Sequence, residues 1–195
     1  MRVIIISGIP GAGKTTVARM LAARFERAAH IEGDLVGHHF IASGLVPPQR
    51  PPQDEADAQL ELRRANICLL ADSFARAGFL PVIDDVVVAP AVLDGYRRRL
   101  RTRPLLLVEL VPRLEVVQAR DRDCDKHVFS IWRHLDAQLQ ASMPRVGLWI
   151  DTSEMTAEQT VDAIEASLDE AVVPRVGGRS GATARSTTAR PRQDE

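Results

Sequence analysis

Cysteine and lysine are both scarce in this chain of 195 residues. Its two cysteines, Cys68 and Cys124, lie in an apolar helical pattern and in a charged segment, so we expect neither a disulfide framework nor a structural zinc site. A reducing cytoplasm fits this cysteine usage. Among 25 basic residues only Lys14 and Lys126 are lysines.

Long apolar runs and an excess of one charge are missing as well. No apolar stretch approaches the roughly 20 residues of a transmembrane helix, and the N-terminal apolar run leads straight into a glycine-rich loop, unlike a signal peptide. A formal net charge of −1 gives no field that would attract nucleic acid or an anionic membrane. The composition predicts a cytoplasmic globular domain that binds neither nucleic acid nor membrane.

The most informative stretch of the chain is its N-terminus. Residues 2–7 form a short β-branched run typical of a buried strand, and an alanine-rich helical pattern follows residue 16. Between them, residues 8–15 read Gly-Ile-Pro-Gly-Ala-Gly-Lys-Thr and match the phosphate-loop pattern G-x-x-x-x-G-K-[ST] at every fixed position. A strand, this loop and a helix in that order predict binding of a nucleoside triphosphate.

The chemistry of such a loop assigns roles to its residues. Glycines let backbone N–H groups approach a phosphate chain, and the helix that follows directs its positive dipole end at the same phosphates. Lys14 would reach the β- and γ-phosphates and act in catalysis, while the Thr15 hydroxyl would bind Mg²⁺. The expected phosphate-binding residues are Gly8, Gly11, Ala12, Gly13, Lys14, Thr15 and Thr16.

Strand and helix patterns alternate along the rest of the chain. Expected strands are 2–7, 29–32, 79–86, 105–111 and 147–151. Expected helices are 17–27, 54–77, 91–101, 114–122, 128–143 and one from 156, and a helix or turn is expected from 34 to about 43. Asp54 and Thr156 are the expected N-terminal caps of two of these helices. This order predicts an α/β domain over residues 1–171 with helices on both faces of a parallel sheet, followed by a disordered tail at 172–195.

Acidic residues follow two of the expected strands, where ligands of parallel sheets gather. Asp84 and Asp85 end an apolar strand, and we expect at least one of them to bind Mg²⁺. Because side chains alternate along a strand, the two point to opposite faces, and the choice between them stays open. Asp34 follows the second strand and could take a proton from an acceptor hydroxyl. The alternatives are a helix cap at Asp34 and Glu32 as the base.

The charged segment 120–126 has two interpretations. Alternating signs are typical of a solvated helix end. In a phosphotransferase, the same pattern forms a mobile lid, here at about residues 120–128, whose arginines neutralise the transferring phosphate and exclude water. Arg120, Arg122 and Lys126 are the lid candidates, although a helical segment would let only one of the two arginines face the site. Arg63 and Arg64 could contact an anionic acceptor, but salt bridges explain them as well.

Together these residues resemble the small P-loop kinases of metabolites and antibiotics, in particular the chloramphenicol phosphotransferase-like group, which is related to the gluconate, shikimate and adenylate kinases. The resemblance rests on residues 8–16, Asp34, the strand end at 82–85 and the segment 120–126, and it spans about residues 1–170. It implies a three-layer P-loop NTPase fold with sheet order 2-3-1-4-5, Asp34 as the base, and ATP with Mg²⁺ as the phosphate donor. The acceptor region, 45–52 and the helix after it, matches no particular family.

The sequence thus predicts a kinase that transfers phosphate from ATP to a hydroxyl of a small molecule such as an antibiotic, a sugar or a related metabolite. The protein could be a monomer or a homo-oligomer. Alternatives are a nucleoside or nucleotide kinase, for which Phe40 and Phe74 are the likeliest base-stacking residues among few aromatics, a zeta-type toxin kinase, and a nucleotide-dependent switch or ATPase. No N-K-x-D motif occurs, which argues against a GTPase switch.

Overall fold

The computed structural model describes residues 1–48, 50–122 and 134–175. Its centre is a five-stranded sheet in the order β2-β3-β1-β4-β5, in which every neighbouring pair is parallel. The strands are β1 Val3–Ser7, β2 Ala28–Glu32, β3 Leu80–Asp84, β4 Leu105–Leu110 and β5 Leu148–Ile150. The predicted sheet order is confirmed.

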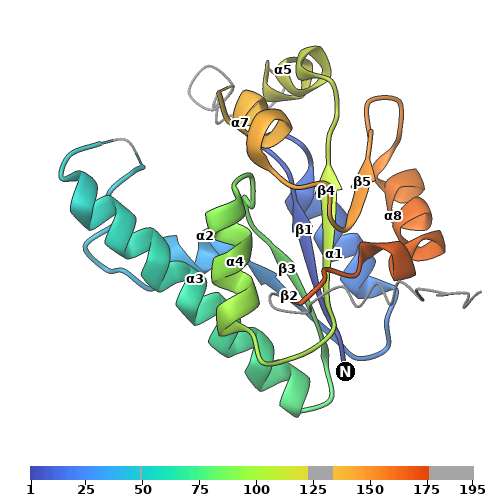
Figure 1. Ribbon diagram of the computed structural model, residues 1–195, viewed down its shortest axis with the longest axis horizontal. Helices are drawn as coiled ribbons and strands as arrows, with labels where there is room; N and C mark the ends of the chain where they lie inside the picture. Colours follow the sequence, from blue (N-terminus) through green and yellow to red (C-terminus); the bar gives the residue numbers. More distant parts are fainter. Residues whose placement is uncertain (49, 123–133, 176–195) are drawn as a thin grey trace, which may run out of the picture.

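Helices cover both faces of this sheet and complete three layers. Figure 1 shows α3 and α4 on one side of the sheet, and α1 and α8 on the other. The described helices are α1 Lys14–Ala23, α2 Gly33–His38, α3 Gln53–Arg76, α4 Pro90–Arg99, α5 Leu114–Arg122, α7 His134–Ser142, α8 Ala157–Ala166 and a 3₁₀ turn, Leu168–Ala171. None of them is both long enough and apolar enough to cross a membrane.

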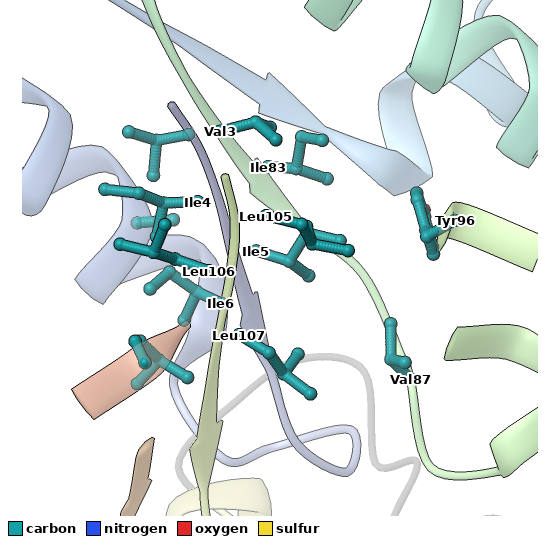
Figure 2. Close-up of a cluster of buried hydrophobic side chains, with 14 of the residues drawn as sticks. Val3, Ile4, Ile5, Ile6, Ile83, Val87, Tyr96, Leu105, Leu106 and Leu107 are labelled. Atoms are coloured by element: carbon teal, nitrogen blue, oxygen red, sulfur yellow. The ribbon is translucent and has the colours of Figure 1, made fainter. Parts of the chain in front are cut away.

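The core forms around the three middle strands, whose residues are buried without exception. Because side chains alternate along a strand, each strand feeds both layers of the core. Figure 2 shows Ile5 and Leu107 on the side of Tyr96 from α4, and Ile4 and Ile6 on the opposite side. Such continuous apolar strands are typical of a parallel sheet covered on both faces.

The two helix caps expected from the sequence have different outcomes. The Thr156 hydroxyl accepts a hydrogen bond from the backbone N–H of Gln159, and the Gln159 side chain accepts one from the Thr156 N–H, so this capping box is confirmed. The cap at Asp54 is wrong, because α3 already begins at Gln53 and Pro52 precedes it. Asp54 instead lies in the first turn, where its negative charge still favours the helix dipole.

The packed chain continues beyond the expected domain end at residue 171. Val172 forms a β-bridge with Leu106, and the Val173 N–H donates a hydrogen bond to the Leu105 carbonyl over 2.9 Å. The Val173 side chain is buried in the core. The described chain therefore returns to β4 before it reaches Arg175, and residues 176–195 lie outside the described part.

Candidate active site

The phosphate loop joins the carboxyl end of β1 to the first residue of α1. Gly8 has a φ of +142°, and a Cβ placed there would lie 2.6 Å from the Leu110 carbonyl oxygen, so only glycine fits beside β4. Gly13 precedes the helix in the left-handed conformation. The Lys14 ammonium folds back over the loop and donates a hydrogen bond to the Ile9 carbonyl over 3.1 Å. Backbone and helix dipole are thus arranged as an anion site requires.

Four carboxyl groups, from α2, β4 and the end of β3, lie close enough to the Lys14 ammonium to change its pKa. Burial lowers the pKa of Lys14, while the negative charges of four residues raise it: Asp34, Asp84, Asp85 and Glu109. The structure therefore brings together the strand-end acids that the sequence singled out, and adds Glu109 from the interior of β4. A positive loop facing several acids is the arrangement that a metal-nucleotide complex completes.

Asp84, the last residue of β3, points toward the phosphate loop. Its Oδ1 accepts a hydrogen bond from the Gly33 N–H over 3.1 Å, whereas its Oδ2 is buried and has no hydrogen-bond partner among the described residues. Burial raises the pKa of Asp84, but the neighbouring His30 and Thr15 side chains outweigh this effect and hold the pKa below its ordinary value. The carboxyl is therefore ionised. His30 Nε2 lies 3.6 Å from Oδ2. A buried, ionised oxygen beside Thr15 that accepts no hydrogen bond and has only the His30 ring near it fits a divalent cation.

Asp85 points to the opposite face of the sheet and is fully engaged. Its Oδ1 accepts a hydrogen bond from Arg63 Nη2 over 2.5 Å, and its Oδ2 accepts one from the Tyr96 hydroxyl over 2.7 Å. Burial and the Asp85 charge raise the pKa of Tyr96 well above its ordinary value, so the phenol keeps its proton. The expected metal role of Asp85 therefore has no geometric basis, because both oxygens already hold partners.

Asp34 lies in the first turn of α2, with 64% of its side chain exposed. Its Oδ1 accepts a hydrogen bond from Arg63 Nη1 over 3.0 Å. The helix-cap alternative is wrong, since Glu32 occupies the position before the helix. Arg63 is only 8% exposed and joins the exposed Asp34 to the buried Asp85, so salt bridges account for it, as one of its two interpretations predicted.

The lid candidates fall largely outside the described residues. Arg120, in α5, donates a hydrogen bond through Nη2 to the Thr152 carbonyl over 3.1 Å. Arg122 is the last residue of α5, but its side chain is not among those described, and Lys126 lies in the segment 123–133, which is not described. The lid at about residues 120–128 stays a prediction.

Sequence reasoning missed Glu109 and Tyr96. Glu109 is completely buried, its backbone pairs with Ser7, and neither carboxylate oxygen has a hydrogen-bond partner in the described chain. Burial raises the pKa of Glu109 to about 8, against the opposing effects of Ser7 and Lys14. A single acid inside the apolar run Leu-Leu-Leu-Val-Glu-Leu was the available signal for Glu109. Nothing in the sequence around Tyr96 pointed to its contact with Asp85.

No protein-family model and no curated protein sequence matches the chain. Solved structures do match. One is a sugar kinase from Janibacter sp. HTCC2649, 20% identical over 88% of this chain and 96% of that chain, with a TM-score of 0.65. Another is a tunicamycin resistance protein from Deinococcus radiodurans, 20% identical over 89% of this chain and 98% of that chain, with a TM-score of 0.62.

A third similar structure contains bound ligands. It is the APS kinase of Mycobacterium tuberculosis in complex with AMPPNP and APS, 14% identical over 86% of this chain and 97% of that chain, with a TM-score of 0.65. The TM-scores of these three structures show a shared fold, and identities this low show nothing beyond the fold. In the described part of this chain, no three His, Cys, Asp or Glu side chains form a metal-binding group of their own. The chain has the three-layer α/β fold of the small P-loop kinases.

Proposed function

We propose that the protein is a cytoplasmic ATP-dependent kinase that transfers the γ-phosphate of ATP to a hydroxyl group of a small molecule. The observation that carries this proposal is the grouping of Lys14, Asp84 and Asp34 at the carboxyl edge of the sheet, around a phosphate loop. The likeness in fold to sugar, gluconate and APS kinases supports it. Fold alone does not fix chemistry, and the residues of the site carry the argument.

The phosphate loop supplies the donor half of the proposed reaction. Backbone N–H groups of residues 8–16 and the N-terminus of α1 surround the phosphates, and Lys14 balances the charge of the β- and γ-phosphates. Thr15 and the free Oδ2 of Asp84 would hold Mg²⁺, which when bound neutralises the phosphate oxygens. One buried carboxylate with one hydroxyl suits Mg²⁺, because this ion keeps waters and phosphate oxygens as its other ligands.

Asp34 supplies the acceptor half. Its exposed carboxylate accepts the proton of the acceptor hydroxyl while the new oxygen–phosphorus bond forms and the bond to the β-phosphate oxygen breaks, leaving ADP. The proton then passes from Asp34 to water. Arg63 fixes the carboxylate through Oδ1 and leaves Oδ2 for this exchange. Because Arg63 is held in turn by Asp85, the base is anchored to the core of the domain.

A nucleoside kinase would need an aromatic side chain that stacks on the base, and one of the two candidates, Phe74, lies away from the site. Phe74 lies against Phe79, which directly precedes β3, with ring centroids 6.1 Å apart. It therefore lies at the amino ends of the strands, away from the phosphate loop. Phe40, with 67% of its surface exposed after α2, is the remaining candidate for stacking on a base.

Transfer of labelled γ-phosphate tests the proposal directly. The wild-type chain, with ATP and Mg²⁺, is offered nucleosides, sugars, sugar nucleotides and hydroxylated antibiotics. We expect a labelled product with one acceptor class and none with Lys14→Ala, while Arg19→Ala, which removes a positive charge from the exposed side of α1, stays active. ATP binding without transfer to any acceptor, in both wild type and control, would contradict the proposal and favour a switch.

A further inference from the structure

An arginine-lined cleft lies at the opposite end of the sheet from the phosphate loop. Its volume is about 580 Å³, and more than half of its lining residues are arginines: Arg97, Arg98, Arg101, Arg103 and Arg175. The cleft lies where α4 ends, where β4 begins and where residues 173–175 return to the sheet, near the end marked N in Figure 1. We call it the arginine cleft.

The charges of the arginine cleft are poorly balanced. No Asp or Glu is among the described residues that line it. Arg97 pairs with Asp94 over 2.9 Å, and Arg103 donates hydrogen bonds to two backbone carbonyls. Arg98 and Arg101 are exposed, and their guanidinium groups form no hydrogen bond or ion pair within the described chain, although the charge of Arg101 acts on the nearby Asp72 carboxylate. In a protein with a net charge of −1, this local excess of positive charge raises the affinity for anions.

The backbone that presents these arginines is held in place. Asp72, on α3 and only 5% exposed, accepts hydrogen bonds from the backbone N–H groups of Arg101 and Thr102 and from the Thr102 hydroxyl. Arg103 additionally binds the Arg97 carbonyl at the end of α4 over 2.6 Å. The loop is therefore ordered before any ligand arrives, which reduces the entropy lost on binding.

The chemistry of the arginine cleft favours phosphate groups. A guanidinium presents paired donors that match two oxygens of one phosphate, and Arg98 and Arg101 have these donors free. Leu105 and Val173 add an apolar floor for the uncharged part of a ligand. The volume lies within the range of small-molecule sites, about 300–1,000 Å³.

The arginine cleft is separate from the phosphate loop. Leu105 is the first residue of β4 and lines the cleft, while Leu110 is the last and lies beside Gly8. Five residue steps along a strand span roughly 17 Å. We propose that the arginine cleft binds a small molecule carrying two or more phosphate groups, independently of nucleotide binding at the phosphate loop.

Calorimetric titration of the full chain with inorganic tripolyphosphate tests this site. Wild type should bind at two sites, and Lys14→Ala should weaken only the one at the phosphate loop. The double variant Arg98→Ala/Arg101→Ala should lose at least roughly tenfold in affinity at the other site, because each charged hydrogen bond contributes substantially. The matched control is Arg19→Ala/Arg76→Ala, which removes the same charge from exposed positions elsewhere and should bind as wild type does.

Two results would overturn the proposal. One is unchanged tripolyphosphate binding in Arg98→Ala/Arg101→Ala, with circular dichroism showing a folded protein. The other is tighter binding of a ten-nucleotide single strand than of tripolyphosphate at equal salt, lost in the same variant, which would make the cleft a nucleic-acid surface. Phosphate transfer at the active site should be the same in this variant and in wild type, so the outcome does not depend on the proposed function.

Discussion

The adjacent residues Asp84 and Asp85 have different surroundings in this protein. Asp84 keeps one buried oxygen free beside the phosphate loop, and Asp85 gives both oxygens to Arg63 and Tyr96. The difference arises because consecutive strand residues face opposite layers, one covered by α1 and the other by α3 and α4. The proposed metal-binding role of Asp84 and the structural role of Asp85 are therefore separated by a single step along the chain.

Substitution by asparagine should separate these roles. Asp84→Asn should abolish Mg²⁺-dependent phosphate transfer with little loss of stability. Asp85→Asn should lower the free energy of unfolding by about 3–5 kcal/mol, because it leaves the buried Arg63 without its main counter-charge. Urea denaturation and the labelled-phosphate assay on both variants measure the two effects. Equal loss of stability in both variants would contradict the assignment.

Asp34→Asn tests the proposed base. The amide oxygen can still accept the hydrogen bond from Arg63 but cannot take a proton from the acceptor. We expect kcat to fall by roughly 10²–10⁴-fold, while the affinity for ATP measured by calorimetry stays unchanged. A wild-type kcat in this variant would remove Asp34 from the mechanism, and Glu32 would be the next residue to test.

Glu109 makes stability depend on pH. The folded protein holds the Glu109 proton up to a pKa of about 8, whereas the unfolded chain releases it near 4.5. The folded state thus binds more protons between these values, and the free energy of unfolding falls as pH rises through them, by at most about 1.4 kcal/mol per pH unit. Glu109→Gln should remove this dependence.

Urea denaturation at pH 5, 6.5 and 8 measures the effect of Glu109→Gln. The difference in the free energy of unfolding between the variant and wild type should grow in favour of the variant, by on the order of 2–4 kcal/mol across the series. A constant difference would show that Glu109 titrates at its ordinary pKa.

At the scale of elements, the turn between β1 and α1 depends on one close contact. Gly8 and Gly44 both have positive φ, but only at Gly8 would a Cβ meet a backbone oxygen, that of Leu110. Gly44→Ala should cost about 1 kcal/mol of stability for its left-handed conformation alone. Gly8→Ala should cost about 1–3 kcal/mol more and weaken ATP binding, because the loop must move away from β4. Calorimetry with ATP and urea denaturation compare the two; equal effects would contradict this account.

The long helix α3 connects the two ends of the molecule. Near its middle Arg63 contacts Asp34, the proposed base, and near its end Asp72 holds the loop of the arginine cleft. Both residues lie on the buried side of the helix. One element therefore holds residues of both proposed sites, and these contacts explain why Arg63 and Asp72 are buried although they are charged.

At the scale of the whole molecule, residues 172–175 belong to the domain. A chain ending at Arg175 should keep wild-type stability, whereas one ending at Ala171 should lose about 1.5–3 kcal/mol with the buried Val173 side chain and its hydrogen bond to Leu105. Thermal and urea denaturation of both truncated chains measure this. If the chain ending at Arg175 is as unstable as the shorter one, residues 176–195 contribute to the fold.

The two ends of the sheet differ in the charge that prevails around them. Acids and the phosphate loop lie at the carboxyl ends of the strands, and the arginine cleft lies at the amino end of β4. A net charge of −1 averages over both regions, so the composition hides a positive surface that only the folded chain assembles.

Features that depend on neighbours along the chain were predictable from the residues alone. The strand, phosphate loop and helix at residues 2–27, the alternation of strands and helices, and the capping box at Thr156 all follow from local patterns. The sheet order followed from the resemblance that those patterns carried. These properties are readable because each one involves residues close in sequence.

Contacts between polar groups on different elements became visible only in the folded chain. Arg63 contacts Asp34 and Asp85, 29 and 22 residues away, and Glu109 is buried beside Ser7 across more than 100 residues. Periodicity gives the face on which a side chain lies but not its partner on another element. The proposal of Asp84 for the metal, the contact of Arg63 with Asp34 and the arginine cleft all depend on such distant partners, so they emerge only when the chain has folded.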